Sequence, residues 1–128
     1  MRKLVKYALN KLGCKAKFII VEWKEKSPAA VIKQDGYYEI RVNKRLLKRH
    51  GTRRCLFHES VHIWQYETGR LVDVDDYCLW EGVKHKIFSE GEEYFWSPWE
   101  IEARGMEDAL LWSAKKWKEN TQKKTKKS

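Results

Sequence analysis

The most informative stretch of the sequence runs from His58 to His62 and reads His-Glu-Ser-Val-His. On an α-helix, residues four apart lie on the same face, so these two imidazoles could bind one metal ion. Glu59 would project beside them, within reach of a water on the metal but not placed as a ligand. In this HExxH pattern the zinc lowers the pKa of its water, and the glutamate accepts the proton and later delivers it to the leaving amine. The stretch therefore predicts a zinc site with Glu59 as general base.

The same residues could instead form a helix with two partly exposed histidines and a surface glutamate. The neighbouring residues argue against that alternative, because Phe57, Val61 and Trp64 fall on one stripe of the helix. A deeply packed helix would bury the histidines and the glutamate, and such burial is costly without a partner. The apolar surroundings therefore favour a bound metal ion.

A catalytic zinc normally has three protein ligands and one open position, so a third ligand is needed. The short extension HExxHxxGxxH is absent after His62, and the candidates are Glu100 and Glu102 in the last predicted helix. These two differ by about 200° around a helix, so only one can face the metal. Glu100 is preferred, because Ala103 one turn later would permit close approach of the two helices. If Glu100 instead forms a capping box with Ser97, Glu102 becomes the ligand.

The elements that must position these residues follow from periodicity and turn residues. Helices are predicted over residues 2–12, over 52–68 with Thr52 as cap and Gly69 as stop, and from 98 to about 117, with a short helical turn over 46–51. Strands are predicted over residues 15–23, 30–33 and 37–42, and a second hairpin over 78–80 and 83–88. Asp35-Gly36 predicts a tight turn between the strands 30–33 and 37–42. The expected fold class is α+β.

With these motifs and this order of elements, the chain resembles the gluzincin clan of zinc metallopeptidases, which pair HExxH with a downstream glutamate. Residues 100–103 supply the second motif. The resemblance is closest to the minigluzincins and to small HExxH proteins of phages and archaeal viruses. It implies a minimal zincin fold with a backing helix, a small antiparallel or mixed sheet, an HExxH active-site helix and a C-terminal glutamate helix. It also implies a metalloendopeptidase in which His58, His62 and Glu100 bind one Zn²⁺ and Glu59 is the general base.

One position departs from the family pattern. The family often has an acidic or amide residue four positions after the ligand glutamate, where it orients a ligand histidine, and Arg104 stands there instead. The orienting group must then come from another residue. Candidates for the donor to the developing oxyanion are Tyr77, His85, Tyr94 and Arg104. In larger gluzincins the substrate lies along an edge strand, for which Tyr37–Val42 is the best candidate.

The net charge of +9 is concentrated at the C-terminal end, since residues 115–128 contain seven lysines against one glutamate. We expect a single domain over residues 1–115 and a Lys-rich, disordered tail over 116–128. Residues 115–128 could hold nucleic acid weakly, or could serve only as a solubilising segment. The partner of a peptidase would be a peptide or protein substrate. The alternative function is a catalytically weak or latent zincin-fold module that binds nucleic acid or protein through its basic tail.

Several features predict a cytoplasmic location without membrane contact. No apolar run approaches the length of a membrane span, and the N-terminus lacks the apolar stretch of a signal peptide. The three cysteines, Cys14, Cys55 and Cys78, are odd in number and widely spaced, which fits reduced thiols better than a disulfide framework.

Overall fold

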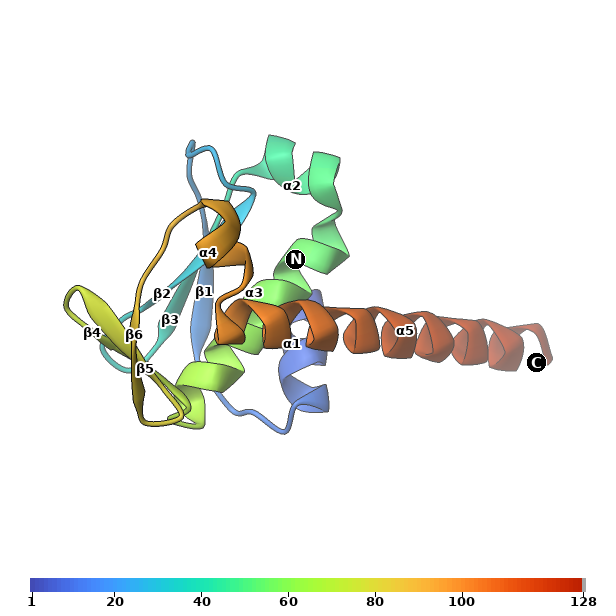
Figure 1. Ribbon diagram of the computed structural model, residues 1–128. Helices are drawn as coiled ribbons and strands as arrows, with labels where there is room; N and C mark the ends of the chain where they lie inside the picture. Colours follow the sequence, from blue (N-terminus) through green and yellow to red (C-terminus); the bar gives the residue numbers. More distant parts are fainter. Residues whose placement is uncertain (128) are drawn as a thin grey trace.

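The computed structural model describes the backbone of residues 1–127 and the side chains of residues 1–116. Within this part of the chain, five helices and two three-stranded sheets form the α+β fold that the sequence predicts (Figure 1). The helices are α1 (Arg2–Lys11), α2 (Lys44–His50), α3 (Thr52–Glu67), α4 (Gly91–Phe95) and α5 (Pro98–Lys127). The strands are β1 (Phe18–Glu22), β2 (Ala29–Lys33), β3 (Tyr38–Val42), β4 (Leu71–Val74), β5 (Tyr77–Trp80) and β6 (Val83–Lys86).

The first sheet is mixed and has the strand order β1-β3-β2. Strands β2 and β3 form the predicted antiparallel hairpin, in which Gly36 takes the left-handed conformation with φ of +80°. Strand β1 pairs in parallel along the other side of β3. The prediction that Tyr37–Val42 is an edge strand is therefore wrong, because β3 is paired on both sides. The edge strand that borders α3 is β2.

The second sheet is an antiparallel meander with the order β4-β5-β6. Its β5–β6 hairpin was predicted, and its turn uses positive φ angles at Glu81 and Gly82. Strand β4 was not predicted, because only Leu71 of its four residues is buried and acidic residues surround it. Leu71 and Cys78 pack against Trp99 at the start of α5, which fixes this sheet to the glutamate helix.

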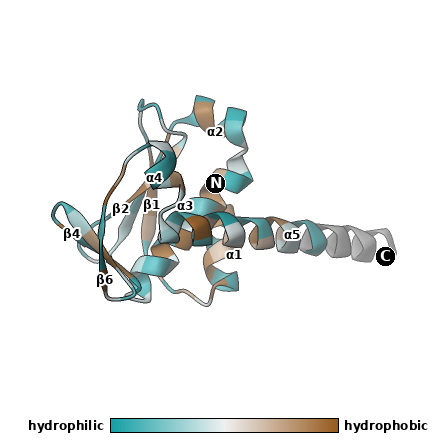
Figure 2. Ribbon diagram, in the orientation of Figure 1, coloured by the Kyte–Doolittle hydropathy of each residue, from teal (hydrophilic) through white to brown (hydrophobic). Residues whose placement is uncertain are grey.

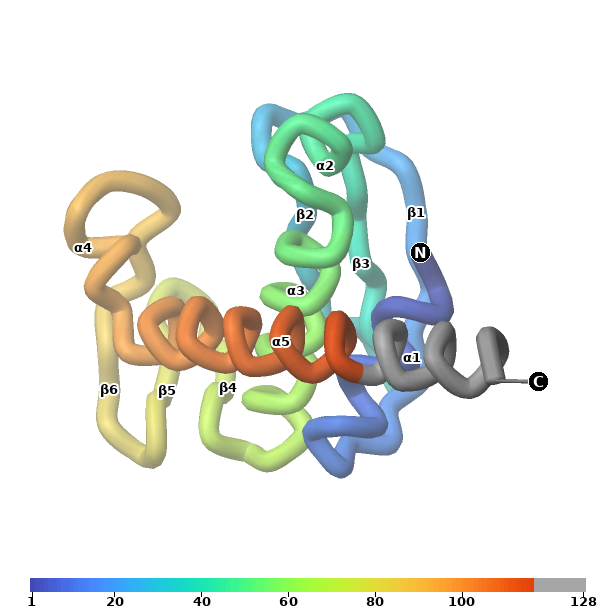
Figure 3. The backbone as a smooth tube through the Cα atoms, turned by 90° about the vertical axis from the view of Figure 1, so that its right-hand side faces the viewer, coloured from blue at the N-terminus to red at the C-terminus, as the bar shows by residue number. Residues whose placement is uncertain are grey.

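Helix α3 lies between the first sheet and α5, and α5 crosses α3 (Figures 1 and 3). Hydrophobic residues gather where α1, α3 and the first sheet meet (Figure 2). On the other side of α3, Phe57 and Val61 contact Ala103 of α5, and all three side chains are fully buried. Ala103 thus sits at the close contact of α3 and α5 that the sequence predicts. The predicted Thr52 cap is wrong: Gly51 is the N-cap of α3, and Thr52 is its first helical residue.

Helix α5 begins at Pro98, as predicted, and its helical backbone continues to Lys127. The helix end that the sequence places near residue 117 is therefore wrong. Almost all side chains of the predicted tail, residues 116–128, lie outside the described residues. The binding role of this segment therefore stays a prediction. Among the described helices, none combines the length and apolar character of a membrane span.

Candidate metal centre

Three side chains from two helices converge on one point beside the core. His58 Nε2 lies 2.9 Å from Glu100 Oε1, and His62 Nε2 lies 3.0 Å from Glu100 Oε2. The ligand atoms of His58, His62 and Glu100 all lie within 4.8 Å of one another. The chain therefore contains a His58-His62-Glu100 group close enough to bind a metal ion, formed by the residues that the sequence analysis assigns as ligands.

The second nitrogen of each imidazole has its own acceptor. His58 Nδ1 lies 2.7 Å from Glu107 Oε2, and His62 Nδ1 lies 2.8 Å from Gln65 Oε1. These acceptors fix a proton on each Nδ1, so that each Nε2, which faces Glu100, is the nitrogen that would bind a metal; this is the usual support of metal-binding histidines. Two imidazole nitrogens and one carboxylate are a donor set that suits zinc. The residues therefore fit a zinc ion.

Glu107, and not the residue at position 104, is the acidic group that orients His58. Its side chain is 5% exposed and is itself held by Arg54, whose Nη1 donates to Glu107 Oε1 over 2.7 Å. Arg104 instead donates to the carbonyl of Phe95 and stacks over its ring. Glu107 was not predicted from the sequence, although its position two helical turns after Glu100 places both carboxylates on one face of α5.

Glu102 is drawn away from the histidines. Its carboxylate accepts hydrogen bonds from Arg70 and from Gln65 Nε2. The capping box that would have occupied Glu100 is not formed, because the Ser97 hydroxyl donates to the Glu93 carbonyl and the Glu100 carboxylate faces the two histidines. Of the two candidate glutamates, the structure brings Glu100 into the cluster.

The cluster holds its protons tightly when no metal is bound. Burial alone would lower the pKa of His58, but hydrogen bonds to Glu100 and Glu107 outweigh it and raise that pKa to about 10. Burial opposes ionisation of Glu100, yet hydrogen bonds from the two histidines hold its pKa well below the usual range. A metal ion must therefore displace protons at neutral pH, so we expect metal binding to release protons and to weaken as pH falls.

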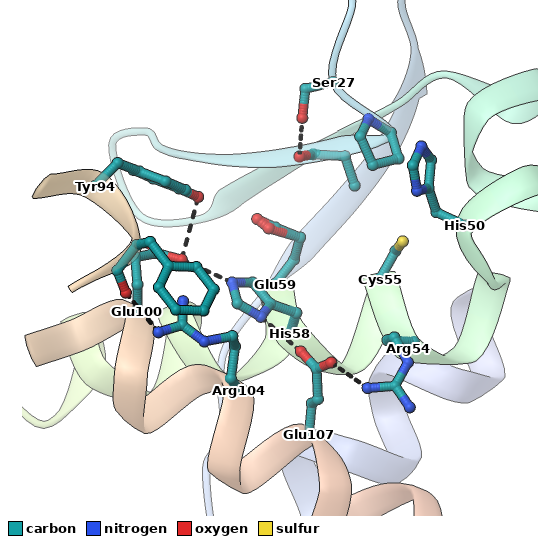
Figure 4. Close-up of a pocket in the computed structure, with 13 residues that line it drawn as sticks. Ser27, His50, Arg54, Cys55, His58, Glu59, Tyr94, Glu100, Arg104 and Glu107 are labelled. Carbon is teal, nitrogen blue, oxygen red and sulfur yellow. Dashed lines mark hydrogen bonds and ion pairs between the residues drawn. The ribbon is translucent and has the colours of Figure 1, made fainter. Parts of the chain in front are cut away.

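Glu59 is the other ionisable group near the two histidines, and its carboxylate differs from those of Glu100 and Glu107 in its surroundings. Its side chain is 7% exposed, and no hydrogen bond or ion pair to its carboxylate occurs among the described side chains. Burial raises its pKa, while the nearby histidines lower it. Figure 4 shows the carboxylate directed into the cavity above His58, away from Glu107. A buried carboxylate with a raised pKa is a stronger base than an exposed one, which suits a group that accepts a proton and later returns it.

Two cavities, each of about 390 Å³, meet at Glu59. The first cavity lies on the His58 side, and Arg54 and Arg104 form part of its wall (Figure 4). The second cavity lies on the His62 side, between edge strand β2 and the second sheet. Glu59 and Glu100 line both, so a chain bound across the two cavities would pass over the cluster.

The structure separates the four candidate oxyanion donors. Tyr94 lines both cavities, and its hydroxyl donates to Glu100 Oε1 over 3.1 Å. Arg104 lines the first cavity, whereas Tyr77 and His85 line neither of these two. Tyr94 is carried by α4, a short helix that was not predicted from the sequence.

Comparisons of the chain with protein-family models, with curated proteins and with solved structures find no match. The resemblance to the gluzincin clan stays a prediction from the two motifs, His58–His62 and residues 100–103. The case for a function therefore rests on the geometry and chemistry of the site.

Replacement of Glu107 by alanine should weaken zinc binding about 10- to 100-fold, because His58 would lose the acceptor that fixes its ring and its tautomer. The dissociation constant can be measured by competition with a chromophoric chelator. Asp108→Ala is the matched control, since Asp108 is exposed and contacts Arg54 but not His58. Equal zinc affinity in the Glu107→Ala variant and the parent protein would show that Glu107 does not orient His58 for metal binding.

Proposed function

We propose that the protein is a zinc-dependent endopeptidase in which His58, His62 and Glu100 hold one Zn²⁺. The observation that carries this proposal is Glu59, a buried carboxylate without a partner among the described side chains, at the junction of two cavities. A purely structural zinc site needs no acid or base beside its ligands. The position of Glu59 therefore favours hydrolysis over a structural role for the metal.

Each residue of the site has a separate task in this proposal. The zinc would supply Lewis acidity, which lowers the pKa of a water molecule and polarises the substrate carbonyl. Glu59 accepts a proton from the attacking water and returns it to the leaving amine. Glu107 and Gln65 hold the two imidazole rings in place. Tyr94 is the candidate donor to the developing oxyanion, because its hydroxyl already reaches Glu100.

The shape of the site suits an extended peptide. Strand β2 is an edge of the first sheet, and Ala29, Ala30 and Val31 line the second cavity beside Glu59 and His62. An edge strand offers unpaired backbone groups to which an extended chain can add as a further strand. Strand β2 thus takes the substrate-binding role that the sequence analysis gave to Tyr37–Val42.

The alternative is a catalytically weak or latent module that binds nucleic acid or protein through residues 116–128. Its basis is the lysine content of that segment, whose side chains lie almost entirely outside the described residues. Such a module would bind zinc as well, so zinc content alone does not separate the two functions. Hydrolysis does.

The proposal is tested by removing and restoring the metal. We expect close to one zinc per chain and cleavage of an unfolded protein at internal peptide bonds. Cleavage should stop when a chelator strips the metal and should return with one equivalent of Zn²⁺. Cleavage that survives complete removal of the metal would refute a zinc peptidase, and a chain that binds zinc without cleaving any substrate would favour the binding module.

A further inference from the structure

The two cavities that meet at Glu59 differ in the charged groups of their walls. The wall of the first cavity contains two arginines, Arg54 and Arg104, and also Glu107, which pairs with Arg54. The wall of the second cavity contains two aspartates, Asp73 and Asp75, and neither lysine nor arginine occurs among its described lining residues. A peptide that spans both cavities would therefore meet a different electrostatic environment on each side of its scissile bond.

The second cavity combines an apolar floor with an acidic rim. Leu71, Cys78 and Trp99 are buried together and form the floor. Asp73 lies two residues after Leu71 on β4, so it faces the same side of the strand, and it pairs in register with Cys78. Asp75 follows in the β4–β5 turn, where its φ is 52°. Both aspartates are exposed, so their carboxylates lie at the mouth and not on the floor.

The negative charge of the rim is not neutralised by nearby cations. No ion pair to Asp73 or Asp75 occurs among the described residues, and the hydrogen bond that Asp73 accepts comes from the neutral hydroxyl of Tyr66, at 2.9 Å. At the inner end of the same cavity, the Glu59 carboxylate has no hydrogen bond or ion pair among these residues, and His62 lies near it. In the first cavity, by contrast, Arg54 pairs with Glu107. The rim of the second cavity therefore keeps its negative charge.

We propose that the second cavity selects a lysine or arginine side chain of the substrate beside the scissile bond. The inference rests on the peptidase function proposed above and names its substrate class. A basic side chain has an apolar stem and a charged end, which match the floor of Leu71 and Trp99 and the rim of Asp73 and Asp75. An acidic side chain in the same place would be repelled, so selectivity comes from repulsion as well as attraction.

Binding tests the inference without requiring turnover. The Glu59→Gln protein is titrated with capped hexapeptides that differ only in having Lys, Leu or Glu at one position. When the varied position is the one that enters the second cavity, the Lys peptide should bind about tenfold more tightly than the Glu peptide. This difference in affinity should shrink at high salt. This preference should vanish in the Asp73→Asn/Asp75→Asn background and persist in Asp76→Asn/Glu90→Gln. The control double variant makes the same change in net charge at exposed residues that line neither cavity.

Cleavage of the same peptides by the protein with Glu59 intact separates the two proposals. Faster cleavage of the Lys peptide, lost in Asp73→Asn/Asp75→Asn, supports both. A binding preference for Lys without cleavage of any peptide would refute the peptidase function and leave the charge selectivity standing. Cleavage with equal binding of the Lys, Leu and Glu peptides would overturn the selectivity and leave the peptidase function standing. A Lys preference that survives Asp73→Asn/Asp75→Asn would also overturn it.

Discussion

Replacement of Glu59 by glutamine is expected to reduce kcat for peptide cleavage by about 10²- to 10⁴-fold while zinc content is retained. Glutamine has nearly the same shape as glutamate but cannot take a proton from the attacking water. Glu59 is not part of the His58-His62-Glu100 group, so the metal affinity should change little. Since burial of its charge is costly, the neutral amide should leave the thermal stability unchanged or slightly raised. Rates on a quenched fluorescent peptide, zinc analysis and thermal unfolding measure the three effects.

Glu67→Gln is the matched control for this experiment. Glu67 is the last residue of the same helix and is exposed, so the same chemical change should leave kcat unaltered. A Glu59→Gln variant that cleaves at the rate of the parent protein would assign the general base to another residue. A variant that loses its zinc would show that Glu59 acts as a ligand.

Replacement of Glu100 by glutamine should weaken zinc binding by more than about 100-fold, a larger loss than removal of an orienting residue gives. The anionic ligand is lost, and both imidazole Nε2 atoms lose the carboxylate that now lies 2.9 and 3.0 Å from them. In the metal-free protein, the depressed pKa of Glu100 stabilises the fold above the ordinary pKa of a glutamate, and this contribution is lost as pH falls through the folded-state value. The variant should therefore be less stable than the parent at neutral pH.

Glu102→Gln makes the same substitution on the same helix and should keep zinc affinity within about threefold of the parent protein, because Glu102 contacts Arg70 and Gln65 but neither histidine. Arg70 would retain its contact with Glu81. Zinc affinities from chelator competition compare the two variants directly. Equal losses in both would mean that the two carboxylates exchange places around the metal.

The cluster was predictable to the extent that it depends on local geometry. The spacing of His58 and His62 places them on one face of any helix, and the apolar stripe of Phe57, Val61 and Trp64 indicates burial. The choice between Glu100 and Glu102 was open because it depends on the hydroxyl of Ser97. That hydroxyl donates to a carbonyl in α4, and α4 gives too weak a sequence signal to be predicted.

The errors in the fold have a related cause. The order of strands in the first sheet depends on the parallel pairing of β1 with β3, and contacts between distant segments leave no periodic signal in either strand. The hairpin of β2 and β3 was predicted because its turn is local. Glu107 was missed because it lies outside the motif, although the two-turn spacing from Glu100 was visible in the sequence.

The position of the cluster also bears on how the chain resists unfolding. Glu100 is separated from His58 by 42 residues, and the intervening segment contains all of the second sheet and α4. A metal bound by both helices would act as a cross-link that closes this loop. Because the unfolded chain does not hold the ion, this link stabilises the folded state by mass action, by about 4 kcal/mol when the free ion concentration is about 1,000 times its Kd. The ion proposed for catalysis would then also tether the acidic wall of the second cavity to the rest of the fold.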